Sequence, residues 1–124
     1  MPSIDSHYYS TMINGRKYTV QVRRIWEAAK GLPVEIIDPR DYPEFENLME
    51  QDAFLMFGPP SDDDGRLVVR DVMWHAERIM NADLNFPIIL SPDGRLMDGN
   101  HRLMKAAITG QSIRVQTLRK WPDP

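Results

Sequence analysis

The stretch that decides the fold is FPIILSPDGRLMDGNHRLMKAAITGQSIRVQTL, residues 86–118. An apolar run over 87–90 is followed by Ser-Pro-Asp-Gly, which has proline at the second and glycine at the fourth position of a type I turn. Residues 95–97 return from this turn as a second strand, so the segment predicts a β-hairpin. An apolar, alanine-rich run over 103–109 then predicts a helix that ends at Gly110.

Between the hairpin and the helix lies Asp98-Gly99-Asn100-His101-Arg102. Gly99 permits a tight turn with positive φ, and Asn100 is a residue type that caps helices, which places His101 and Arg102 in the first helical turn. The first N–H groups of a helix have no partner within the helix and attract anions. Arginine offers a planar fork of donors that fits phosphate oxygens, and histidine adds another donor. The turn therefore predicts a phosphate site with a carboxylate beside it.

A simpler interpretation stays open on the residues alone. Asp98 and Arg102 have the spacing of an ion pair at a helix start, and His101 could be a solvated surface residue.

The same residues resemble the core of the ParB/sulfiredoxin superfamily. The shared pattern comprises Pro87, Ile88, Gly94, Asp98, Gly99, His101, Arg102, Ala106 and Gly110. Over residues 17–118 the chain is similar to a branch of bacterial ParB-like proteins, through Trp26, Leu32-Pro33-Val34 and most of HAERIMNADLNFPIILSPDGRLMDGNHR, residues 75–102. The resemblance implies an α+β fold with a small mixed sheet of four or five strands flanked by about three helices.

Departures from the pattern limit what the resemblance implies. Sulfiredoxins have a nucleophilic cysteine where this chain has Asn100, and the chain contains no cysteine, which excludes that chemistry. ParB proteins that bind CTP have Gly-Glu-Arg-Arg in place of residues 99–102. Archaeal free-serine kinases have Asp-Gly-His-His-Arg, which differs from this turn only at Asn100. The resemblance thus implies nucleotide binding with phosphoryl transfer as an associated activity.

The resemblance also suggests roles for individual residues. Gly99, Asn100, His101 and Arg102 would hold phosphates, and Asp98 would be catalytic, orienting Mg²⁺ or a reacting hydroxyl. In sulfiredoxins the helix before the hairpin contacts ATP, and the corresponding positions here are Asp71, Trp74 and Arg78, none of the family's residue type. Arg78 could reach a phosphate and His75 could face the pocket, the alternatives being a surface arginine and a structural histidine. Glu35 and Asp38 are outside candidates for a base.

The N-terminal half is organised around one helix. Residues 1–15 predict a tail or extended arm with a turn at Asn14-Gly15, ahead of a strand at 17–20. Val22, Ile25, Trp26 and Ala29 share one face of a helix over 22–30, so Trp26 is expected in the core. A strand is predicted at 33–37.

The middle of the chain is patterned less clearly. Residues 53–57 are apolar enough for a buried strand, and 58–65 have the composition of a loop, in which Asp62-Asp63-Asp64 is expected to be solvated rather than a metal site. From residue 69 or 70 to 82 a second helix places Val72, Met73, Ala76, Ile79 and Met80 on one apolar face.

Composition bounds the function classes. The chain has 124 residues, of which 42% are hydrophobic, and no cysteine. This length and composition predict one domain over 16–124, located in the cytoplasm and without a signal peptide. No apolar run approaches the ~20 residues that span a membrane. A net charge of −3 argues against sequence-specific DNA binding, because DNA phosphates require a basic face, although segments 16–24 and 114–120 are locally basic.

Two functional classes follow. In the first, the chain is an NTPase or small-molecule kinase that uses a nucleotide (ATP, ADP or CTP), with Mg²⁺ at Asp98. In the second, it is a non-catalytic ligand sensor or protein-interaction module that keeps the phosphate-binding turn and takes a phosphorylated small molecule. Nuclease activity is disfavoured, because the sequence shows neither a basic surface nor a clustered metal site.

Overall fold

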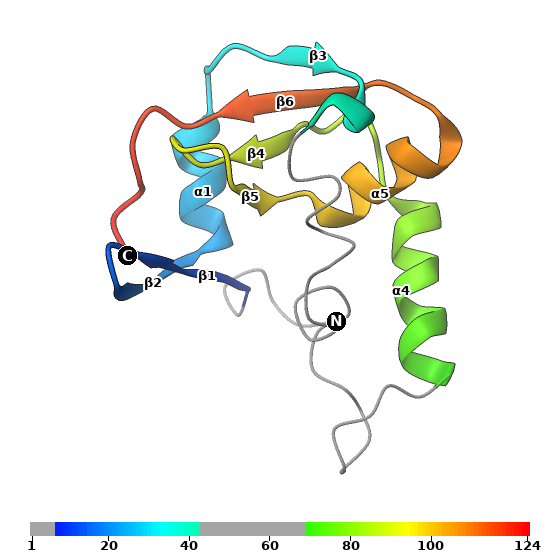
Figure 1. Cartoon of the computed structure of the whole chain (residues 1–124), viewed down its shortest axis with the longest axis horizontal. Coiled ribbons are helices and arrows are strands. Elements are labelled where there is room, and N and C mark those ends of the chain that lie inside the picture. Colours follow the sequence, from blue (N-terminus) through cyan, green and yellow to red (C-terminus); the bar gives the residue numbers. More distant parts are fainter. Residues whose placement is uncertain (1–6, 43–68) are drawn as a thin grey trace.

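The computed structural model of the chain describes residues 7–42 and 69–124 (Figure 1). The predicted strand at 53–57 and the aspartate-rich loop lie outside the described residues. The elements are, in chain order, β1 (Tyr8–Ile13), β2 (Arg16–Gln21), α1 (Val22–Ala29), β3 (Glu35–Ile37), a short 3₁₀ helix (Pro39–Asp41), α4 (Val69–Asn81), β4 (Ile88–Leu90), β5 (Leu96–Asp98), α5 (Asn100–Thr109) and β6 (Ile113–Thr117).

The central sheet has four strands in the order β3-β6-β4-β5. The β4 strand runs parallel to β6, while β3–β6 and β4–β5 are antiparallel, so the sheet is small and mixed as predicted. The predicted hairpin is confirmed, because the N–H of Gly94 donates to the carbonyl of Ser91 at 3.0 Å and closes the turn between β4 and β5. The fold class predicted from the sequence, α+β with about three helices, is therefore correct.

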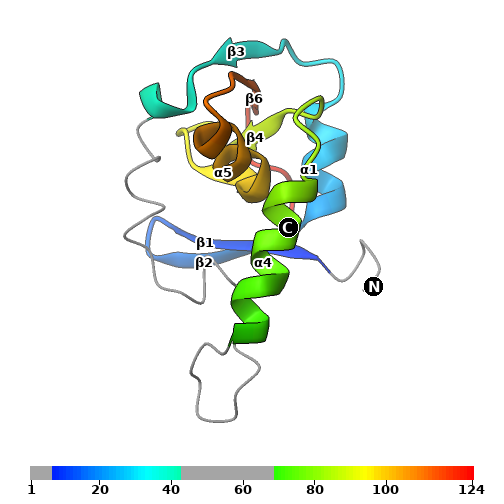
Figure 2. The ribbon, with the colours of Figure 1, turned by 90° about the vertical axis from the view of Figure 1, so that its right-hand side faces the viewer.

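Both faces of this sheet are covered. Ile88 and Leu90 point to the side of α5, where they pack with Leu103 and Ala106. Ile89, between them in β4, points to the opposite side and packs with residues of α1 and β2. Figure 2 shows the strands of the sheet between α5 and α1. Burial on two faces explains why residues 87–90 form a continuous apolar run rather than an alternating one.

The N-terminal segment is more ordered than the predicted tail. Residues 8–13 form β1, which pairs antiparallel with β2 from Tyr8↔Gln21 to Ile13↔Arg16. Asn14 and Gly15 both have positive φ, 51° and 79°, which is the geometry of a two-residue hairpin turn. The side chain of Arg95, just before β5, links β1 to the four-stranded sheet. It donates to Thr11 Oγ1 at 3.0 Å and to the carbonyl of Met12 at 2.7 Å.

One prediction about a helix face is wrong, and a second face is more exposed than an apolar face usually is. In α1, Ile25 and Ala29 are buried as expected, but Trp26 is 42% exposed and does not belong to the core. In α4 the predicted bounds hold to within one residue, yet the predicted apolar face is exposed at Val72, Met73 and Met80. His75 is instead the buried residue of α4 among the side chains that the structure describes, and it faces α5.

Candidate functional site

The turn between β5 and α5 is built around Gly99. This residue has φ +102° and is the N-cap of α5, with no side chain capping the helix. A Cβ atom here would lie 2.7 Å from Cγ2 and 3.0 Å from Cα of Ile88, so the turn packs directly against β4. The predicted positive-φ turn is confirmed. The predicted cap is wrong, because Asn100 is the first residue of the helix, and its Oδ1 atom is buried without a hydrogen-bond partner among the described residues.

Arg102 links α5 to β5 and to the residue before β4 on one side of this turn. Its guanidinium donates to the carbonyl of Pro87 and, at 3.3 Å, to Oδ2 of Asp98. The same Oδ2 accepts a hydrogen bond from Nε1 of Trp26 at 2.8 Å. The Arg102 and Asp98 side chains are 20% and 19% exposed. The ion pair that the residues left open as the simpler interpretation is thus formed between β5 and α5. Its hydrogen bonds with Trp26 and Pro87 connect it to α1 and to the residue before β4.

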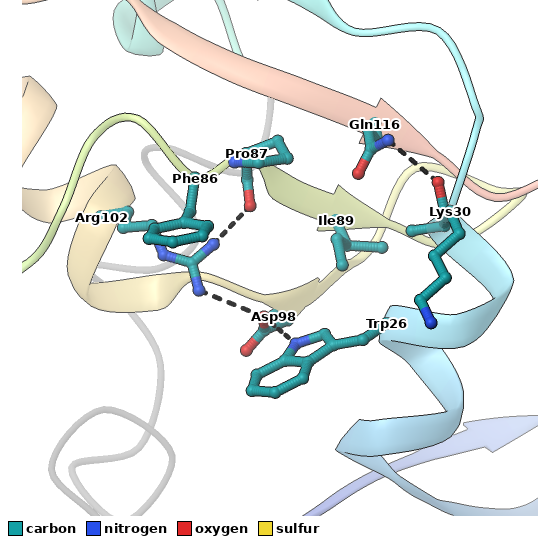
Figure 3. A pocket seen from close by; sticks show the side chains of 9 residues that line it. Trp26, Lys30, Phe86, Pro87, Ile89, Asp98, Arg102 and Gln116 are labelled. Atoms are coloured by element: carbon teal, nitrogen blue, oxygen red, sulfur yellow. Dashed lines mark hydrogen bonds and ion pairs between the residues drawn. The ribbon is translucent and has the colours of Figure 1, made fainter.

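A pocket opens beside this ion pair. Its volume is about 360 Å³, within the range of roughly 300–1,000 Å³ that is usual for small-molecule sites. Apolar groups dominate the lining, and polar groups come from Trp26, Lys30, Asp98, Arg102 and Gln116 (Figure 3). The lining residues are Trp26, Ala29, Lys30, Phe86, Pro87, Ile89, Asp98, Arg102 and Gln116.

The predicted site residues separate into two groups. Asp98 and Arg102 line the pocket, whereas His75 and His101 contact each other and do not line it. The two histidine rings meet edge to face with centroids 4.8 Å apart, and Nε2 of His101 lies 3.2 Å from Nδ1 of His75. Arg78 is exposed on α4 and acts electrostatically on both rings.

The histidine pair is held in its neutral form. The pKa of His101 is lowered to about 4, chiefly by burial, with smaller lowering contributions from His75, Arg78 and Arg102 and a raising one from Asp98. Burial, followed by the charge of Arg78, also lowers the pKa of His75. His101 is therefore uncharged at pH 7 and can contribute a hydrogen bond, but not a positive charge, to a bound anion.

These pKa shifts predict a loss of stability in acid. The unfolded chain takes up a proton on His101 near pH 6.5, whereas the folded chain does so only near pH 4. The free energy of unfolding should therefore fall as the pH drops from about 6.5 to about 4. In urea unfolding measured across this range, His101→Gln should show a shallower pH dependence than the wild type. The control His7→Gln changes an exposed histidine and should keep the wild-type slope, and equal slopes in all three proteins would contradict the assignment.

Sequence reasoning predicted Asp98 and Arg102 and missed the other seven residues of the pocket, of which four have aromatic or polar side chains: Trp26, Lys30, Phe86 and Gln116. Gln116 is the Cα partner of Ile89 across the parallel β4–β6 pair, so its side chain shares the face covered by α1. That register links residues 27 positions apart and leaves no local signal in the sequence. Glu35 and Asp38, the outside candidates for a base, are not near the ion pair. They lie in or beside β3, separated from β5 by two strands, and Asp38 caps the 3₁₀ helix.

Among residues 7–42 and 69–124, no group of three or more His, Asp or Glu side chains is arranged to hold a metal ion. Within the same residues, no helix has the length and apolar content needed to cross a membrane. We found no match to a protein-family model, to a curated protein or to a solved structure.

Proposed function

We propose that this chain binds a nucleotide or a related phosphorylated small molecule with an aromatic ring. The observation that carries the proposal is the pocket itself, in which two exposed aromatic side chains stand beside a shielded ion pair at a helix start. A largely apolar cavity with a few convergent polar groups is the usual form of a small-molecule site.

The aromatic lining supports the ring-binding part of the proposal. Trp26 is 42% exposed and Phe86 is 61% exposed, which leaves apolar ring surface in contact with water. Stacking a base on an aromatic side chain contributes about 1–3 kcal/mol and works with any flat ring. The hydrogen bond from Nε1 to Asp98 fixes the Trp26 ring in place, so little freedom is left for a ligand to remove.

The local charge supports the anion-binding part. Lys30 and Arg102 place two positive charges on the pocket lining against the single negative charge of Asp98. Asp98 and Arg102 also flank the start of α5, whose first N–H groups have no side-chain cap. A phosphate near this helix start would gain about 0.3–2 kcal/mol from the helix dipole and about 1.5–3 kcal/mol from each charge-assisted hydrogen bond.

Binding without turnover fits the position of Asp98 better than catalysis does. Its Oδ2 atom already accepts hydrogen bonds from Trp26 and Arg102, and both hold the carboxylate in a structural role. An NTPase or kinase remains the second candidate because Oδ1 makes no hydrogen bond in the described part of the chain and Asp98 lines a pocket that could hold Mg²⁺ with ligand phosphates. Product release measured with each nucleotide, with and without Mg²⁺, separates the two candidates.

The binding proposal is tested by thermal unfolding with ATP, ADP, CTP and GTP, each with and without Mg²⁺. A ligand at a hundredfold excess over its Kd should stabilise the folded chain by about 2.7 kcal/mol. Trp26→Leu should weaken binding by at least about tenfold, the equivalent of one lost stacking contact. The matched control is Trp74→Leu on exposed α4, which should bind like the wild type. Absence of a shift with every nucleotide, or equal losses in both variants, would defeat the proposal.

A further inference from the structure

The side-chain amide of Gln116 has a fixed orientation. Its Nε2 atom donates to the carbonyl of Ala29 at 2.9 Å and to the carbonyl of Leu32 at 3.1 Å. Backbone carbonyls can only accept hydrogen bonds, so the nitrogen must face them and the oxygen must face away. The end of α1 thus determines which way this amide points.

The oxygen of Gln116 is left as an acceptor on the pocket wall. Figure 3 shows it turned away from α1 toward the middle of the pocket. Within residues 7–42 and 69–124, Oε1 of Gln116 accepts no hydrogen bond. Ile89, its neighbour across the sheet, offers only an apolar side chain beside it. A fixed acceptor in an apolar wall gains most from a ligand that brings a donor to that point.

A second unused acceptor belongs to a residue that lines the same cavity. Asp98 uses Oδ2 for both Trp26 and Arg102, which leaves Oδ1 without a hydrogen bond in the described residues. The single donor of Trp26 is already engaged with this carboxylate. The pocket groups that can still hydrogen-bond a flat ligand are therefore mainly acceptors. The ammonium of Lys30 is available for an anionic group of the ligand.

From this arrangement we infer that the pocket selects rings that carry an exocyclic amino group, with the amino group directed at Oε1 of Gln116. The inference rests on the proposed function and adds a ligand class to it: bases of the adenine or cytosine type rather than their oxo counterparts. An oxo group in the same position would place its acceptor oxygen next to Oε1 of Gln116, and neither oxygen would then have a hydrogen bond. Sites built to hydrogen-bond an N–H group discriminate strongly against analogues that lack it.

The test compares two pairs of nucleosides that differ at this one group, adenosine with inosine and cytidine with uridine, by titration calorimetry on the whole chain. In at least one pair, the amino compound should bind about tenfold or more tightly than its oxo partner. Equal affinities within both pairs would overturn the inference while leaving ring binding intact. Failure of all four nucleosides and of all nucleotides to bind would overturn the inference together with the proposed function.

Gln116→Met examines the residue itself, because methionine has a similar length and no acceptor oxygen. The preference for the amino compound should shrink to within about twofold, since the partner of the amino group is lost. The change also removes the two hydrogen bonds from Nε2 to the carbonyls of Ala29 and Leu32, so the folded state of the variant is checked separately. The matched control is Gln111→Met, which changes an exposed glutamine outside the pocket and should keep the full preference. If Gln116→Met kept the full preference for the amino compound and a wild-type circular dichroism spectrum, another group would be recognising the amino group of the ring. The wild-type comparison within each pair decides the inference even if this variant does not fold.

Discussion

Gly99→Ala is expected to lower the free energy of unfolding by about 2–5 kcal/mol. The new Cβ atom would lie 2.7 Å from Cγ2 of Ile88 and 3.0 Å from its Cα, and backbone cannot move aside as a flexible side chain could. Overpacking of this kind costs about 1–3 kcal/mol. The φ of +102° adds about 1–2 kcal/mol, because an L-residue with a side chain is strained there. Urea unfolding at 25 °C measures the sum.

Gly94→Ala is the matched control for this prediction. Gly94 also has positive φ, +88°, but no atom lies within 4 Å of the position of its Cβ. The control should therefore lose only the conformational part, about 1–2 kcal/mol. If the two variants were equally stable, the close packing of the turn against β4 would be incorrect.

Arg102→Met is expected to destabilise the chain by about 2–4 kcal/mol. The change removes the donor to the carbonyl of Pro87 and leaves the Asp98 carboxylate, only 19% exposed, without its positive partner. An ionised group shielded from water and deprived of its partner is more costly than an ordinary lost hydrogen bond. The control Arg119→Met changes an exposed arginine and should alter the free energy of unfolding by less than about 0.5 kcal/mol.

A double variant isolates the role of the charge. In Arg102→Met with Asp98→Asn, the amide oxygen still accepts from Trp26 but no unpaired charge remains. The double variant should recover about 1–2 kcal/mol relative to Arg102→Met alone, because the two side chains are coupled. Strict additivity of the two single changes would mean that the ion pair contributes nothing to the fold.

The sequence predicted well where local chemistry decides the structure. The Ser-Pro-Asp-Gly turn, the positive φ at Gly99 and the end of α5 at Gly110 each depend on residues that are close in the chain. Turn types and helix ends impose φ values that only certain residues accept, so composition at these points is strongly informative. The Asp98–Arg102 pair could also be anticipated, since both residues flank one turn.

The pocket could not be predicted in the same way, because its lining residues belong to elements that are far apart in the chain and come together only in the folded structure. Helical periodicity correctly grouped Trp26 with Ile25 and Ala29, but it does not specify how wide a face the neighbouring sheet covers. The short α1 buries Ile25 and Ala29 and leaves Trp26 at the edge, where it meets Asp98, 72 residues later in the chain. The buried position of His75 on α4 was not predicted for the same reason, because it depends on the contact of His75 with His101 on α5.

Ligand binding beside Trp26 is the central claim, and the indole N–H signals of the three tryptophans test it most directly. The Trp26 indole donates to Asp98 inside the pocket, Trp74 is exposed on α4, and Trp121 packs against Tyr18 near the C-terminus. When ¹⁵N-labelled protein is titrated with ATP, the indole signal of Trp26 should shift in a saturable manner, while the signals of Trp74 and Trp121 stay in place. A Trp26 signal that does not move with any of the four nucleotides, or three signals that drift together without saturation, would contradict the account.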